Sequence, residues 1–249
     1  MNITIITVVY NAKNDIIPTI EAVLNQTLSP YEYLLIDGAS KDGTLDVVKS
    51  YQERFIQKGI RYRYISEPDK GIYDAMNKGV NLAEGDFIVF SNAGDWLDLD
   101  AVKVFSDVFN KERYDFAYGS IAYIGKKQFI KPSRKDTFIS SRNWNHPSSI
   151  VRKELYLNNP FDLKYSIYAD FDWFLKMRKM NIRITILPSD KVISNFKVGG
   201  VSINGDFKFA LRRAREKYRA YSMNGYSKIY CIESYGWEMV KYIFAKINT

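Results

Sequence analysis

Cysteine and histidine are almost absent from this chain, which holds one of each among its 249 residues. The single cysteine, Cys231, excludes a disulfide framework within one chain. The single histidine, His146, leaves too few ligands for a zinc site built from cysteine and histidine. Both absences are typical of a reducing, cytoplasmic setting, which we therefore predict.

Long apolar runs and glycine-rich phosphate loops are also missing. No run of 18 apolar residues occurs, so the sequence predicts no membrane-spanning helix, and its start, MNITIITVVYNA, carries no basic leader. There is no Gly-x-Gly-x-x-Gly turn after the first apolar run and no Gly-x4-Gly-Lys-Ser/Thr loop. A dinucleotide-binding Rossmann domain is therefore not expected, and a bound nucleotide would need a metal ion held by carboxylates.

The positive charge is unevenly distributed along the chain. The formal net charge is +8, yet residues 1–100 hold 9 Lys and Arg against 15 Asp and Glu. Residues 126–153 hold 8 against 1, and residues 206–249 hold 9 against 4. A basic second half indicates either an anionic partner surface or an ordinary solvated face.

Strands and helices are predicted to alternate over the first 120 residues. Short apolar runs at 3–9, 33–36, 61–65 and 87–90 predict strands, and apolar residues at helical spacing separate them. This order predicts an α/β fold with a single mostly parallel sheet and helices on both faces. Ligands of such sheets lie at the carboxyl ends of the strands.

The rest of the chain has weaker patterns. Residues 120–150 are basic and rich in serine, which predicts a connection, while a helix is expected at about 170–180 and a strand at 183–187. The last 45 or so residues are helical in pattern, basic and rich in tyrosine. We therefore predict a main domain of residues 1–205 and a helical C-terminal appendage of residues 206–249.

Two carboxylates follow predicted strands. Asp95 comes after the run at 87–90, and Mg²⁺ or Mn²⁺ takes such hard oxygen ligands together with phosphate oxygens. The structural alternative is that Asp95 or Asp98 caps the helix that follows. Asp37 ends the second strand, where a carboxylate accepts hydrogen bonds from a nucleotide base or ribose, or simply begins a turn.

Asp170 and Asp172 stand at the head of a predicted helix. Their spacing of two residues prevents them from sharing one helix face, so one carboxylate can face a cleft while the other caps or pairs. A carboxylate in a cleft is a suitable general base for an acceptor hydroxyl. The structural alternative is that both are acidic residues of the kind favoured at any helix N-terminus.

Together these segments resemble the family 2 glycosyltransferases of the GT-A fold, most closely the branch that builds bacterial surface polysaccharides. The resemblance covers about residues 1–205, and the order and spacing of its motifs are more specific than any one of them. The motifs are TVVYN (7–11), DGASKDGT (37–44), KGIYDAMNKG (70–79), FSNAGD (90–95), ADFD (169–172) and FKVGGVS (196–202).

The resemblance implies an inverting transfer of a sugar from a nucleotide-diphosphate donor, with UDP as the nucleotide, to a hydroxyl of a saccharide or lipid-linked acceptor. It implies Asp170 as the catalytic base and Asp95 as the ligand of one Mn²⁺ or Mg²⁺. The donor-binding residues that it implies are Thr7, Val8, Val9, Tyr10, Asp37, Lys70, Asp74, Asn77 and Asn92. The acceptor-side candidates are His146, Asp172 and Gly200.

Two departures from the family pattern leave alternatives open. Asn92 and Gly94 stand where other members carry aspartates, and Ala169 replaces the glutamate before the base. A sugar-nucleotide-binding module with a degenerate metal site is therefore the first alternative. The charge and the tyrosines suggest a nucleic-acid-binding protein as the second. Carboxylates at strand ends would repel phosphate in the absence of metal, so we expect no nucleic-acid partner. His146, as a lone histidine, has a structural role as its alternative.

The basic and aromatic residues of 206–249 suit the headgroup layer of an anionic membrane, where a lipid-linked acceptor would lie. They predict reversible peripheral contact with the inner face of the membrane. The alternative is that the aromatic side chains pack on the catalytic body while the charges face water.

Overall fold

The structure, a computed structural model, describes residues 1–125, 128–134, 144–197 and 206–247, with side chains of the last helix described as far as residue 243. Contacts divide the chain into two compact units. The first contains residues 1–160 and 182–197, and the second contains residues 161–181 and the C-terminal residues. The C-terminal helices thus share a unit with residues 161–181, and the division after residue 205 stays a prediction.

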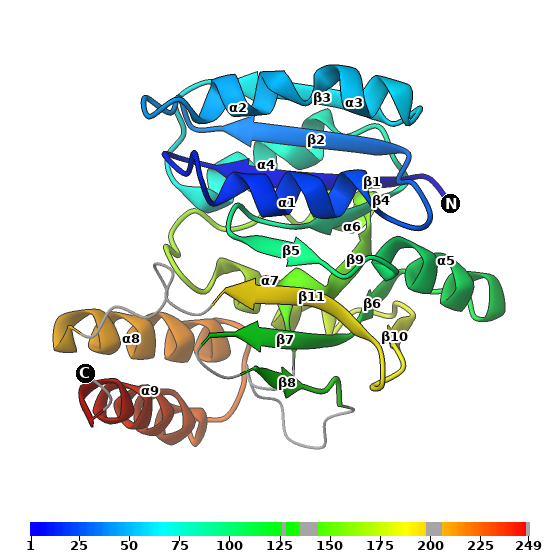
Figure 1. The fold of residues 1–249 in the computed structure, drawn as a ribbon. Helices are drawn as coiled ribbons and strands as arrows, with labels where there is room; N and C mark the ends of the chain where they lie inside the picture. Colours follow the sequence, from blue (N-terminus) through cyan, green and yellow to red (C-terminus); the bar gives the residue numbers. More distant parts are fainter. Residues whose placement is uncertain (126–127, 135–143, 198–205, 248–249) are drawn as a thin grey trace. The chain divides into compact units, whose positions relative to one another are not determined.

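The first unit is built on a seven-stranded sheet in the order β10-β6-β9-β4-β1-β2-β3 (Figure 1). Neighbouring strands pair in parallel except at β9, which is antiparallel to β4 and β6. The strands are β1 Ile3–Val9, β2 Glu32–Asp37, β3 Arg61–Ser66, β4 Phe87–Phe90, β6 Phe116–Tyr118, β9 Ser149–Arg152 and β10 Ile184–Ile186. The mostly parallel sheet predicted from the sequence is confirmed.

Strand β1 lies inside the sheet because its side chains are apolar or β-branched on both faces, and all seven residues are buried. It pairs in parallel with β2, where Val9 lies opposite Asp37, and with β4, where Ile6 lies opposite Phe90. The carboxyl ends of β1, β2 and β4 therefore lie at one edge of the sheet.

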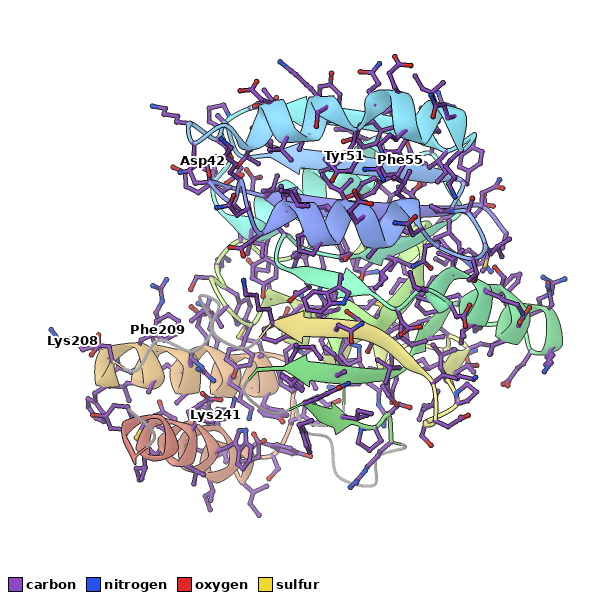
Figure 2. The ribbon with its side chains drawn as sticks, viewed as in Figure 1. Asp42, Tyr51, Phe55, Lys208, Phe209 and Lys241 are labelled. Atoms are coloured by element: carbon purple, nitrogen blue, oxygen red, sulfur yellow. The ribbon has the colours of Figure 1, made fainter. Side chains whose placement is uncertain are left out.

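Helices cover both faces of this sheet. Ile5 packs into one core with α1 (Ile16–Leu24), and Tyr51 and Phe55, labelled in Figure 2, belong to the same core. Ile6 lies against α4 (Ile72–Leu82), which approaches closely because a Cβ on Gly79 would lie 2.8 Å from Ile6 Cγ2. The other helices of this unit are α2 Thr44–Ser50, α3 Gln52–Gln57, α5 Ala101–Lys111, α6 Lys153–Asn158 and the 3-10 helix η1 His146–Ser148.

A second, four-stranded sheet in the order β5-β11-β7-β8 is the main element that the sequence pattern did not predict. Its strands are β5 Asp95–Leu97, β7 Ser120–Ile124, β8 Phe129–Lys131 and β11 Val192–Lys197. The connection expected at 120–150 is wrong in part, because β7, β8 and the start of β9 lie there. These strands are too short for a period-two pattern to stand out, and they pair with distant segments.

The second unit contains α7 (Ala169–Met177), α8 (Phe207–Met223) and α9 (Tyr230–Ile247). Helix α8 packs against both α7 and α9. The ring of Tyr221 on α8 lies 5.1 Å from that of Phe171 and 4.2 Å from that of Tyr230. Aromatic side chains of the basic C-terminal segment therefore form part of this unit's own core. No helix in the part of the chain that the structure describes is long and apolar enough to cross a membrane.

Candidate active site

The end of β1 is tied to the loops after β2 and β4. The Val9 carbonyl accepts a hydrogen bond from Gly38 N at 2.9 Å, and the Val8 carbonyl accepts one from Ala93 N at 3.3 Å. Thr7 is buried, and its hydroxyl donates to a carbonyl just after β4 at 2.7 Å. Thr7, Val8 and Val9 thus hold the two loops beside each other, and their contact with a donor stays a prediction.

The backbone turns sharply after β1 and after β2. Asn11 has φ of 47° and Ala39 has φ of 61°, a region that costs residues with a side chain about 1 kcal/mol or more. The Asn11 N–H donates to Ser40 Oγ at 2.8 Å, and its Oδ1 accepts from Lys41 N at 2.9 Å, which stabilises both turns. Tyr10 is left 66% exposed, so its ring is accessible to a flat ligand such as a nucleobase.

Asp37 is fully buried at the end of β2. Its carboxylate accepts hydrogen bonds from the Ser40 N–H at 3.1 Å, from the Ser40 hydroxyl and from the Ser66 hydroxyl at 2.5 Å. In this conformation both oxygens are engaged within the protein, so Asp37 orders the loop after β2. Its contact with a base or ribose stays a prediction.

Asp69, after β3, lies beside a predicted donor-binding segment and was not selected from the sequence. Its Oδ2 fills the space next to Gly38, where an added Cβ would lie 2.5 Å away, and its Oδ1 accepts from Gly71 N at 2.8 Å. The exposed Lys70 lies between these partners, and its N–H donates to Asp74 Oδ2 at 2.9 Å. An aspartate just before the 70–79 motif was visible in the sequence, but nothing indicated that it packs under a glycine of another loop.

Asp95 lies in a turn and not at a helix N-terminus. It begins β5, and α5 starts only at Ala101, so the helix-cap interpretation of Asp95 is wrong. Its N–H donates to the Asn92 carbonyl at 3.0 Å, and its own carbonyl accepts from Thr19 Oγ1 at 2.6 Å. The Gly94 N–H also donates to Thr19 Oγ1, at 3.2 Å. Helix α1 therefore fixes the turn that presents the carboxylate.

The oxygen atoms of this turn fit a divalent cation. Asp95 is 8% exposed, and burial raises the pKa of its carboxyl to about 7, against an opposing hydrogen bond from the Lys197 N–H. Asn92 Oδ1 is buried and has no hydrogen-bond partner among the residues that the structure describes. No group of three or more His, Cys, Asp or Glu side chains gathers in the described ranges. A cation on Asp95 would thus take most of its ligands from water and donor phosphates, as Mg²⁺ commonly does.

His146 is buried at the start of η1. Its ring centroid lies 5.2 Å from that of Phe90 and 5.6 Å from that of Trp144. Burial lowers the pKa of the imidazole to about 3, so the side chain is neutral at physiological pH. An acceptor role for His146 stays a prediction, and it would be that of a neutral group.

The second unit separates the two aspartates of α7 as their spacing required. Asp172 is 2% exposed, and its carboxylate pairs with Lys176 Nζ at 2.6 Å and accepts from Asn224 Nδ2 at 2.8 Å. Asp170 is half-buried, and its Oδ1 accepts from Phe171 N at 2.8 Å. Asp172 is thus engaged in the packing of α7 and α8, while Asp170 remains partly accessible.

Glu216 of α8 holds the loop that leads into α7. One oxygen of its carboxylate accepts from the N–H groups of Ser166, Ile167 and Tyr168 at 3.0, 2.8 and 3.3 Å. The other accepts from Ser166 Oγ at 2.6 Å. The loop is also tied to α9, because Tyr168 OH donates to Glu238 Oε1 at 2.9 Å. No sequence motif pointed to Glu216, since its partners are mostly backbone groups.

The structure thus gathers predicted residues within each unit. The loops after β1, β2 and β4 meet at one sheet edge, while Asn77 is half-buried on α4. Asp170 and Asp172 belong to the second unit and Asp95 to the first. Gly200 lies outside the described residues.

Comparisons with curated proteins identify sugar-transferring relatives. A PGL/p-HBAD biosynthesis glycosyltransferase of Mycobacterium tuberculosis is 28% identical over 187 residues, which cover 74% of this chain and 72% of that protein. Chondroitin synthase of Escherichia coli is 34% identical over 181 residues, which cover 69% of this chain and 26% of that protein.

Solved structures share the fold. TarS 1-349 of S. aureus, in complex with UDP, has a TM-score of 0.64 and 18% identity over 96% of this chain and 71% of that chain. The mannosyltransferase PcManGT of Pyrobaculum calidifontis, in complex with GDP-Man and Mn²⁺, has a TM-score of 0.63 and 17% identity over 98% of this chain and 73% of that chain. The predicted GT-A fold is confirmed. The family model described as Glycosyl transferase family 2 matches residues 4–177, well over half of the sequence, and the chain therefore belongs to glycosyl transferase family 2.

Proposed function

We propose that this glycosyltransferase transfers a sugar from a nucleoside-diphosphate donor, with UDP as the nucleotide, to a hydroxyl of a saccharide or lipid-linked acceptor, with inversion at the anomeric carbon. The observation that carries the proposal is the turn after β4, where the buried Asp95 carboxyl and Asn92 Oδ1 offer oxygen ligands at the sheet edge. The exposed ring of Tyr10, after the neighbouring strand, supports a nucleobase site there.

The similar proteins support the finer terms of this proposal. UDP occupies the TarS structure, which supports a UDP donor, and Mn²⁺ with GDP-Man occupies the mannosyltransferase structure, which supports a divalent metal. The chondroitin synthase relative supports a role in polysaccharide biosynthesis, and we place that role at the cell envelope.

The chemistry that we assign to the chain needs two groups. A divalent metal bound by Asp95 would supply positive charge to the leaving diphosphate. Asp170 accepts the proton of the acceptor hydroxyl as the oxygen bonds to the anomeric carbon. The bond between that carbon and the phosphate oxygen breaks on the opposite side, so a single displacement inverts the configuration. Asp37 and Asp69 keep the loops of the donor site in place through the hydrogen bonds described above.

A nucleotide-release screen tests the donor assignment. We expect purified protein with Mn²⁺ to release UDP from one or more UDP-sugars at least tenfold faster than GDP from GDP-mannose, and chelation of the metal to abolish release. Preference for a guanine nucleotide would contradict the UDP proposal. Tight donor binding without turnover under any metal would instead favour a binding module, the alternative that the single carboxylate of the metal motif keeps open.

We expect Glu216→Ala to lower kcat about 10- to 100-fold with little change in the KM for donor. The loop before Asp170 would lose the carboxylate that accepts its N–H hydrogen bonds, and the base would shift from its position. Glu216→Gln, which keeps one acceptor oxygen, should restore part of the rate. Arg212→Ala is the matched control, since Arg212 pairs with Glu216 from the exposed side and such pairs contribute little. Equal kcat in Glu216→Ala and wild type would contradict this positioning role.

Peripheral contact with the inner face of an anionic membrane, and the cytoplasmic setting that goes with it, stay predictions. Exposed basic residues of α8 would carry that contact: Lys208, Arg212, Arg215 and Arg219.

A further inference from the structure

Helix α9 turns acidic side chains toward α8 and exposes apolar ones, which is the reverse of an ordinary surface helix. Its described acidic side chains face α8, where Glu233 pairs with Lys217 at 2.8 Å and Glu238 pairs with Arg213 at 2.6 Å. Lys241 also pairs with Glu238, at 2.9 Å, and lies on the side of α9 that faces α8 (Figure 2). The opposite face, which begins one residue before the helix, is apolar and exposed. It comprises Ile229 at 61%, Ile232 at 74%, Val240 at 39% and Ile243 at 54% exposure, with Gly236 among them.

This exposed face is symmetric about Gly236. Ile232 and Val240 lie four residues before and after it, and Ile229 and Ile243 lie seven before and after it. Three- and four-residue steps keep all five positions on one face of the helix. Apart from the neighbours of Gly236 in its own helix, no atom of the described residues lies within 4 Å of a Cβ built at Gly236, so the space there is open. Two copies of this face placed antiparallel are therefore complementary to each other, with the two copies of Gly236 opposite each other at the centre.

We propose that α9 is a dimerisation helix, which packs antiparallel on α9 of a second copy of this chain around a two-fold axis at Gly236. A two-fold interface uses the same surface on both subunits, so that residue i contacts j and j contacts i. Ile232 then meets Val240 of the other copy, and Ile229 meets Ile243. The glycines let the two backbones approach, as small residues do where helices cross.

The distribution of charge favours a second copy over an anionic membrane as the occupant. Glu233 and Glu238 pair with α8, and Lys241 pairs with Glu238. Exposed Lys228, just before Ile229, is then the basic flank described beside this face, and one lysine contributes only about 1 kcal/mol at an anionic membrane surface. The exposed basic residues of α8 recur along a face different from the one that Lys217 and Tyr221 turn to α9. A flat membrane that contacted those basic residues would not reach the apolar face of α9 by helical geometry.

Cysteine cross-linking tests the axis itself, in the full-length chain with Cys231→Ser to remove the native thiol. Because position 236 meets its own copy, Gly236→Cys alone should form a covalent dimer in most molecules under mild oxidation, as a disulfide needs Cα atoms about 4.4 to 6.8 Å apart. The matched control is Ser222→Cys, an exposed position on α8, which should form at least tenfold less dimer. A further change, Ile232→Glu, should abolish the Gly236→Cys cross-link while leaving donor turnover unchanged.

Sedimentation of the unmodified chain completes the test. We expect a monomer–dimer equilibrium with a dissociation constant in the micromolar range, because one helix from each copy makes a small interface. Ile232→Glu should shift this equilibrium to the monomer. Equal cross-linking at positions 236 and 222, or a monomer at every concentration, would overturn the proposal. So would a monomer that pellets with phosphatidylglycerol vesicles through Ile232, which would make the membrane the occupant of this face.

Discussion

Asp170→Asn is expected to bind the donor as tightly as the wild type and to transfer sugar about 100- to 10,000-fold more slowly, the usual cost of a lost general base. The amide keeps the shape of the carboxylate but has no comparable affinity for the acceptor proton. The hydrogen bond from the Phe171 N–H to Asp170 Oδ1 should survive the substitution, because an amide oxygen still accepts it. Donor titration and single-turnover transfer assays measure the two quantities separately.

Asp172→Asn is the matched control, on the same turn of α7. We expect its transfer rate per folded molecule to change far less, while the free energy of unfolding falls, because the ion pair with Lys176 is lost from a buried site. If Asp172→Asn abolished transfer while Asp170→Asn left it intact, the base assignment would be reversed.

Asp95→Asn is expected to fold and to lose metal-dependent turnover. The carboxylate is the only one left in the metal motif, and without the cation the charge on the leaving diphosphate goes uncompensated, a loss of several kcal/mol in the transition state. Turnover measured against Mn²⁺ concentration, with isothermal titration of the metal plus UDP, checks the prediction. Full activity at ordinary Mn²⁺ concentrations would remove Asp95 from the metal site.

The raised pKa of Asp95 supplies a control on folding. Burial raises the pKa of Asp95 to about 7, so the protonated carboxyl contributes most to the free energy of unfolding of the metal-free protein below pH 4. This contribution is lost as the pH rises through 7. Asp95→Asn stays neutral, so at pH 8 its free energy of unfolding should exceed that of the metal-free wild type, by about 4 kcal/mol at most. Chemical denaturation at pH 5 and pH 8 measures this difference. A variant less stable than wild type at pH 8 would show that inactivity reflects misfolding.

The parallel core of the fold was predictable because its strands are continuous apolar runs. Residues 3–9 and 87–90 are strands with the predicted ends, since a strand buried on both faces is apolar throughout. The parallel order followed from the helices between the strands. The second sheet was not predictable in the same way, because β5 and β8 have three residues each and gain their partners only in the folded chain.

The candidate site was predictable in its motifs and not in its internal hydrogen bonds. Asp95 and Asp170 could be selected as candidates because each follows or begins an element in a recognisable segment, and their roles stay predictions. The separation of Asp170 from the buried Asp172 followed from helix periodicity. That Asp37 is engaged by two serines depends on Ser66, on another strand, and no local pattern shows such a partner. The anchoring role of Glu216 was hidden for the same reason.

The anchoring of the loop before α7 by Glu216 joins two segments that are synthesised at different times. Tyr168 and Glu216 are 48 residues apart, and all residues of the first unit also precede Glu216, so they are synthesised before this anchor exists. A nascent chain that ends before α8 would lack the carboxylate that accepts from the N–H groups of the loop before α7, and with Asp170 as the proposed base it would transfer sugar slowly. Under that proposed role, α8 would be the element whose synthesis completes the support of the base.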